Sequence, residues 1–188
     1  MFTDGPPRGK ALRAQFEDSD QLVGLRVPDD DSLRAPARAI QAALQTDDRK
    51  AVQAACAAFL ASAARFYDVA APGVKVLASR PLRVREGYQT ELFGDYDPST
   101  AQIRVWMRTA VHKRVTSYGT FLSTLCHEFC HHLDIVKLEF RDSPHTRGFY
   151  ERTAALYHHA RDTPRKALVW VAVPGGKWRI DWQKTRSP

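Results

Sequence analysis

The sequence contains few cysteines, and this scarcity limits the kind of domain it can form. Three cysteines cannot build the paired framework of a small disulfide-stabilised protein. Cys126 and Cys130 lie four residues apart on a predicted helix, in a geometry poorly suited to a disulfide bond. We therefore expect small, buried, reduced side chains, which is typical of a reducing compartment.

An apolar run is also missing from the start of the chain. The first thirty-one residues are polar and acidic, and they lack the apolar stretch of a signal peptide or a membrane span. We expect residues 1–31 to form a flexible or loosely docked polar arm. The sequence therefore predicts a cytoplasmic protein with no membrane segment.

What is present is an ordinary globular composition with a basic excess. Of the 188 residues, 44% are hydrophobic and 26% are charged, which suits one domain with a real core. The formal net charge is +7, and the basic side chains outnumber the acidic ones most clearly near the C-terminal end. This basic C-terminal region could contact nucleic acid, but its charges match no known nucleic-acid motif, and a basic excess is common in bacterial chains. Its basic residues are Arg161, Arg165, Lys166, Lys177, Arg179, Lys184 and Arg186.

The clearest motif is His127-Glu128-Phe129-Cys130-His131, which has the His-Glu-x-x-His pattern of zinc sites. Residues four apart share one face of a helix, so His127 and His131 can direct their ring nitrogens at one cation. Glu128 lies about 100° further round the helix and can reach a water on that cation. Zinc lowers the pKa of such a water towards about 7, and a carboxylate beside it can take the proton. The motif predicts Zn²⁺ as cofactor and Glu128 as general base.

These roles require a helix, and the surrounding sequence predicts one. Ser117 is a suitable N-cap, and neither glycine nor proline interrupts residues 120–136. One face of this helix is therefore expected to be core while the other carries the ligands. The apolar residues opposite His127 are Leu122, Leu125, Phe129, Leu133 and Val136.

A catalytic zinc site usually needs a third protein ligand, and three residues are candidates for it. His145 is preferred, because Ser143 as N-cap and Pro144 as first helical residue would start a rigid helix at His145. Glu151 is an alternative ligand on that same predicted helix. Asp134 shares the face of the two motif histidines but lies a turn or more beyond the metal, which favours a supporting role.

The order of these motifs resembles the SprT-like branch of the zincin metallopeptidases. In that family the third histidine comes shortly before a glycine and a phenylalanine, and here His145 is followed by Gly148 and Phe149. The likeness covers about residues 90–160. This chain departs from the family in the spacing of the glycine, and no pair of Cys-x-x-Cys zinc-ribbon motifs follows.

The resemblance implies a hydrolase: a zinc-dependent endopeptidase (protease) that acts on a polypeptide substrate. His127, His131 and His145 would be the metal-binding residues, and Glu128 would be the catalytic general base. In zincins a strand before the metal helix commonly binds extended substrate by edge pairing, and residues 103–106 take that role by resemblance. An internal strand is the alternative for this segment.

The remaining sequence predicts an α+β fold. Residues 32–188 are expected to form one minimal zincin-like domain, in which N-terminal helices pack on a small mixed or antiparallel sheet. A metal-binding helix, a helix carrying the third ligand and a C-terminal β-hairpin complete it. Outside the metal helix, helices are predicted at 36–44, 49–67 and 145–161, strands at 74–77, 82–85, 90–93 and 103–107, and the hairpin at 168–182.

Two functional questions stay open at this level. The domain could bind zinc without catalysis, as a structural or nucleic-acid-associated module with an occluded site, or hydrolyse a non-peptide amide. A hydrolytic site also needs a donor to the oxyanion besides the metal. The candidates, each of which could equally be a packing or surface residue, are Tyr150, Tyr157, His158 and His159.

Overall fold

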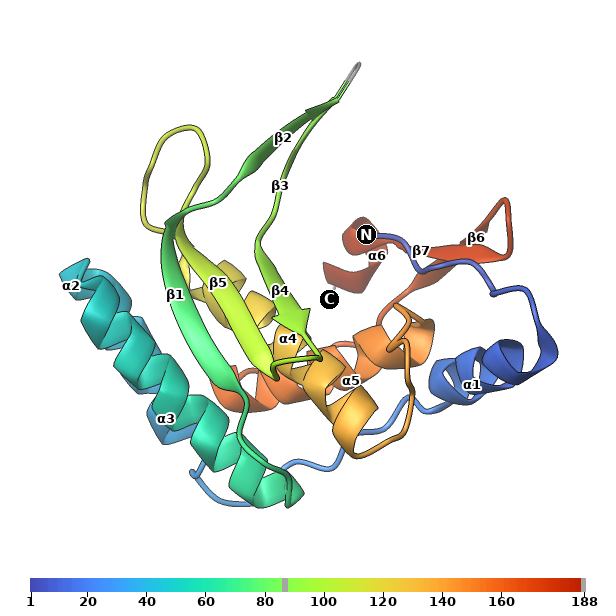
Figure 1. The fold of residues 1–188 in the computed structure, drawn as a ribbon, viewed down its shortest axis with the longest axis horizontal. Helices are drawn as coiled ribbons and strands as arrows, with labels where there is room; N and C mark the ends of the chain where they lie inside the picture. Colours follow the sequence, from blue (N-terminus) through green and yellow to red (C-terminus); the bar gives the residue numbers. More distant parts are fainter. Residues whose placement is uncertain (86–87, 187–188) are drawn as a thin grey trace.

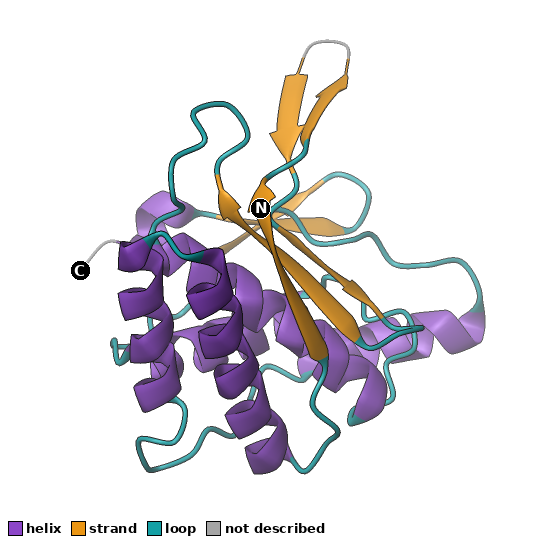
Figure 2. Cartoon of the chain, turned by 60° about the vertical axis from the view of Figure 1, so that its left-hand side comes forward, coloured by secondary structure: helices purple, strands orange, loops and turns teal. Residues whose placement is uncertain are grey.

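The computed structural model describes residues 1–85 and 88–186 and has an α+β fold (Figures 1 and 2), as the sequence predicts. The helices of the described residues are α1 (Lys10–Gln21), α2 (Arg34–Thr46), α3 (Arg49–Tyr67), α4 (Tyr118–Val136), α5 (Arg147–Arg161) and α6 (Trp182–Arg186). The strands are β1 (Gly73–Ser79), β2 (Leu82–Arg85), β3 (Tyr88–Glu91), β4 (Gly94–Asp97), β5 (Gln102–Arg108), β6 (Trp170–Val173) and β7 (Lys177–Ile180).

A three-stranded sheet in the order β1–β5–β4 lies over helices α3 and α4. β1 pairs with β5 in parallel, and β4 pairs with β5 in antiparallel orientation. Ile103 and Val105 are fully buried while Arg104 between them is exposed, so one face of the sheet packs on the helices. β2 and β3 form a separate hairpin that projects beyond this sheet (Figure 1).

The segment expected to be the substrate-binding edge is instead the central strand. Residues 103–106 belong to β5, which pairs with β1 on one side and β4 on the other, so this prediction was wrong. Its backbone polar groups are used in two ladders and are unavailable to a substrate. The sheet has two edge strands, β1 and β4, and the one that contacts α4 is β4. Its mostly polar sequence Gly94–Asp97 has no apolar alternation to reveal it.

The helices around the core follow their predicted patterns closely. α3 begins after Asp48, whose side chain accepts a hydrogen bond from Lys50 N, and α4 begins after Ser117, which accepts one from Thr120 N. Val136, at the end of α4, is 47% exposed rather than buried, because the helix ends there beyond the core. The other predicted core residues of α4 are buried, namely Leu122, Leu125, Phe129 and Leu133.

The N-terminal segment differs from the loose arm that its composition suggests. Helix α1 lies against α5, and Phe2 makes a β-bridge with Arg179 of β7. Ser19 is fully buried, and the buried Arg152 donates hydrogen bonds to the backbone oxygens of Ser19 and Leu22. The segment is held largely by polar contacts, which leave no apolar pattern in its sequence.

The C-terminal hairpin is present as predicted, with β6 and β7 pairing around the turn at residues 174–176. All three cysteines are buried and free, which also agrees with the sequence analysis. No helix within the described parts of the chain has both the length and the apolar character needed to cross a membrane.

Candidate metal centre

Three histidine rings from two segments meet at one point. His127 and His131 project from α4, and His145 comes from the loop that precedes α5. The Nε2 atoms are 3.2 Å apart for His131–His127, 3.1 Å for His131–His145 and 3.0 Å for His145–His127. Nitrogens on one tetrahedral zinc lie roughly 3.3 Å apart, given bonds of about 2.0–2.1 Å. These three histidines can therefore hold a metal ion.

The partners of His131 determine where its ring proton lies. Ser143 Oγ donates to Asp134 Oδ2 at 3.1 Å and lies 2.7 Å from His131 Nδ1. Because the serine gives its one proton to the carboxylate, it must accept from the imidazole, so Nδ1 carries the ring proton. The Nε2 atom of His131 then presents a lone pair to the other two rings.

His145 is oriented in the same sense by an acidic residue from the start of the chain. Asp4 Oδ2 lies 3.4 Å from His145 Nδ1 and accepts a hydrogen bond from the His145 backbone N at 2.8 Å. A carboxylate favours a proton on Nδ1, so Nε2 of His145 also presents a lone pair. Two lone pairs 3.1 Å apart repel each other unless a cation lies between them, and this all-nitrogen donor set fits zinc.

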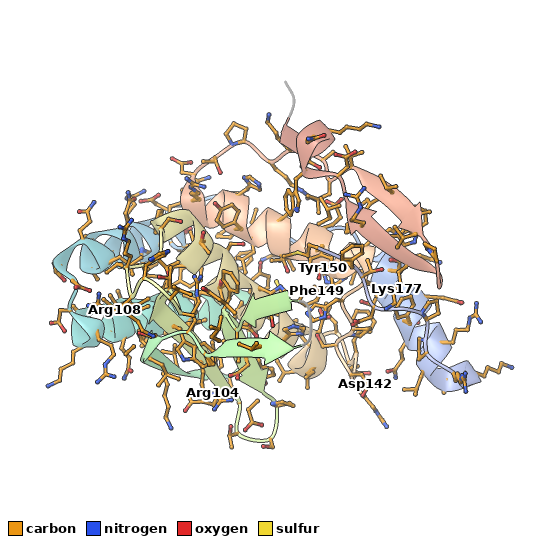
Figure 3. All side chains as sticks on the ribbon, turned by 90° about the horizontal axis from the view of Figure 1, so that it is seen from above. Arg104, Arg108, Asp142, Phe149, Tyr150 and Lys177 are labelled. Atoms are coloured by element: carbon orange, nitrogen blue, oxygen red, sulfur yellow. The ribbon has the colours of Figure 1, made fainter. Side chains whose placement is uncertain are left out.

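Burial keeps His127 and His131 in the neutral form that binds metals. Desolvation lowers the pKa of His127 well below its usual value, with smaller contributions from His131 and His145. Desolvation likewise lowers the pKa of His131 to about 3. The rings of Phe149 and Tyr150, both labelled in Figure 3, cover this cluster. The ring centroids of Phe149 and His131 are 4.5 Å apart, and Tyr150 stacks on His145 with the centroids 5.8 Å apart.

Behind His131, a buried ion pair supports the serine. Asp134 accepts two hydrogen bonds from Arg152 Nη2, at 2.9 and 3.0 Å, and each side chain is 1% exposed. The same arginine holds the end of α1 through the backbone oxygens of Ser19 and Leu22. Asp134 thus supports Ser143 beside His131, a candidate metal ligand, and connects it through Arg152 to the N-terminal segment.

The loop that carries His145 differs from the predicted helix start. The N-cap of α5 is Thr146, whose Oγ1 accepts from Phe149 N at 3.0 Å, so His145 lies just before the helix. Ser143, the predicted cap, has φ of +39° and directs its hydroxyl at His131 and Asp134. The prediction failed because a tertiary contact uses that hydroxyl, while a second cap residue follows three positions later.

The predicted general base lies beneath the edge strand. Glu128 is 5% exposed, and a Cβ atom added to Gly94 of β4 would lie 2.9 Å from Glu128 Oε1. Glycine is therefore needed here for the strand to approach the carboxylate. Burial raises the pKa of Glu128 to about 8, and Asp95 adds to the effect; a cation held by the histidines acts in the opposite direction.

Strand β4 has a free edge on the side facing the site. Phe93 O accepts from Trp106 N, so the antiparallel alternation directs the backbone polar groups of Gly94 and Tyr96 away from β5. A cavity of about 500 Å³ lies there, lined by the three histidines, Glu128 and β4, with Arg141 and Asp142 of the loop after α4 contributing to its wall.

The pair Tyr96–His132, which no sequence motif indicated, fixes this edge. His132 Nε2 lies 2.8 Å from Ala70 O and must donate to it, so Nδ1 accepts from the Tyr96 hydroxyl at 2.9 Å. Tyr96 and His132 thereby attach β4 to α4. The available signal was helical spacing, because His132 follows Glu128 by four residues and shares its face.

The other candidates have different partners. Glu151 accepts hydrogen bonds from Arg165 at 2.7 Å and Trp170 Nε1 at 3.4 Å, and it is not part of the histidine group. The Tyr150 hydroxyl donates to Phe2 O at 3.1 Å rather than facing the cavity. Of the remaining oxyanion candidates, Tyr157 contacts Arg161, and His158 and His159 line a separate cavity of about 460 Å³.

No family model, no curated protein and no solved structure matches this chain.

Proposed function

We propose that this chain is a zinc-dependent metallopeptidase. The observation that carries the proposal is the convergence of three histidines beside a buried glutamate, at a cavity bordered by a free strand edge. Among the described residues, no fourth histidine, cysteine or carboxylate joins the group, as an open catalytic site requires. The motif order that resembles SprT-like peptidases agrees with this donor set and with a minimal zincin-like arrangement.

In this proposal the three histidines and Glu128 have separate roles in hydrolysis. His127, His131 and His145 would hold the zinc, which would supply an activated water and a positive charge beside the substrate carbonyl. Glu128 takes a proton from the attacking water and delivers it to the leaving amine. Its seclusion under Gly94 keeps bulk water from the carboxylate, so the proton passes between the reacting groups.

An extended polypeptide is the substrate that this cavity fits. The backbone N–H and C=O groups of Gly94 and Tyr96 can pair with a substrate strand, and the pairing would place a peptide bond beside Glu128. The attachment of Tyr96 to His132 holds that edge in place. Backbone pairing favours unfolded or flexible segments, with side-chain contacts adding selectivity.

The test is the Glu128→Gln variant assayed on fluorescence-quenched casein. Zinc stoichiometry should stay at one per chain, while the cleavage rate falls by at least about 10²–10⁴-fold, because the general base is lost. Glu139→Gln, which changes an exposed glutamate just beyond α4, is the matched control and should cleave normally. Retained cleavage in Glu128→Gln would refute the mechanism. Bound zinc with a fourth protein ligand and no cleavage by wild type would instead establish the non-catalytic module.

A further inference from the structure

The first four residues of the chain make an unusual set of contacts with one metal-binding histidine. Asp4 N donates to His145 O at 2.9 Å, and Asp4 Oδ2 accepts from His145 N at 2.8 Å. The same carboxylate oxygen lies 3.4 Å from His145 Nδ1. Asp4 therefore holds both the backbone and the ring of His145, although 141 positions separate the two residues.

The position of Asp4 is itself fixed by the C-terminal hairpin. Thr3 N donates to Trp178 O at 2.8 Å, and Trp178 N donates to Thr3 Oγ1 at 2.8 Å. Thr3 is 4% exposed, and Phe2 forms the neighbouring bridge to Arg179. Phe2 and Thr3 thus pair with β7 of the hairpin, and this pairing places Asp4 beside His145.

We propose that Asp4 is a positioning residue for His145, so that the N-terminal segment is a working part of the metal centre. This inference rests on the three-histidine site of the proposed function but not on peptidase activity. A carboxylate on Nδ1 selects the tautomer with a free Nε2 lone pair, makes that nitrogen more basic and restricts ring rotation. His145 depends on this support because it lies on a loop, outside the regular helix that holds His127 and His131.

The strength of the contact between Asp4 and His145 is limited by its exposure to solvent. The side chain of Asp4 is 56% exposed and that of His145 is 34% exposed, so solvent screens their attraction. We expect loss of Asp4 to weaken zinc binding about tenfold, the lower end of the ~10–100-fold range for such partners.

The experiment measures zinc dissociation constants by chelator competition on full-length Asp4→Ala and Asp4→Asn, with visible spectra of the cobalt-substituted proteins. Asp4→Ala should bind about tenfold more weakly and shift the cobalt bands, and Asp4→Asn should fall between it and wild type. Asp4→Asn also carries the test if Asp4→Ala does not fold. Asp30→Ala removes an exposed charge from the same segment and should change neither quantity.

A second control separates positioning from docking. Thr3→Val removes the bond from Trp178 N, but the backbone bond from Thr3 N to Trp178 O and the bridge at Phe2 still hold Asp4 in place. The cobalt spectrum of Thr3→Val should therefore remain that of wild type. Equal weakening in Thr3→Val and Asp4→Ala, or an unchanged dissociation constant in folded Asp4→Ala, would overturn the positioning role. If wild type itself binds no zinc, the metal site fails and this inference fails with it, a result distinct from either outcome above.

Discussion

The two halves of the metal centre are built in different ways. His127, Glu128 and His131 lie on one regular helix, α4, whose own backbone and N-cap set their relative positions. His145 lies on a loop whose placement depends on Ser143, Asp4 and the cap at Thr146. The helix half is thus a local structure, whereas the loop half exists only when distant segments come together.

This difference indicates that the part of the centre most easily disrupted is the loop that carries His145, which lies outside the His-Glu-x-x-His motif of α4. A helix keeps its ligands aligned through many redundant hydrogen bonds and a buried apolar face. The loop half relies on a few polar contacts, several of them to residues of the N-terminal segment. Substitutions in the loop half should therefore affect zinc binding and stability more than substitutions at the start of the helix half.

The largest effect is expected from the loop ligand itself. His145→Ala removes one of three nitrogens, and stoichiometric zinc binding should be lost at micromolar metal in elemental analysis. Glu151→Ala, the alternative ligand on α5, should keep one zinc per chain, because Glu151 binds Arg165 and Trp170 instead. The reverse result, with zinc lost only in Glu151→Ala, would assign the third ligand to the glutamate.

A smaller but substantial effect is expected from the ion pair behind the loop. Arg152→Met leaves the Asp134 carboxylate buried without its partner, and the free energy of unfolding should fall by about 3–5 kcal/mol in urea titrations. Arg13→Ala, which breaks an exposed pair with Glu17, should cost no more than about 0.5 kcal/mol. A loss below about 1 kcal/mol for Arg152→Met would show that the pair is dispensable.

The smallest effect is expected at the start of the metal helix. Ser117→Ala removes the cap of α4 and should lower the free energy of unfolding by about 1 kcal/mol. Zinc affinity should stay unchanged, because the ligands lie more than two turns further along the helix. A marked fall in zinc affinity for Ser117→Ala would contradict the view that the helix half is self-supporting.

The locally formed helix was predicted well from the sequence, whereas the parts that depend on distant contacts were not. The extent of α4, its buried face and the shared face of His127 and His131 were readable from spacing alone. β4 was missed because its sequence is largely polar, and β5 was assigned to the sheet edge although it is central. The docking of α1 was missed because buried hydrogen bonds, unlike apolar faces, leave no periodic pattern.

The sequence by itself therefore determined helix α4, the shared face of the two histidines that could hold a metal and the glutamate between them, because helical spacing is a local property of the backbone. It also singled out His145, but only as one of three candidates. Tertiary structure decided which candidate reaches the other two, which strand offers a free edge and which distant residues hold the rings in place. These choices depend on contacts such as Asp4 with His145 and Asp134 with Arg152, which join segments far apart in the chain.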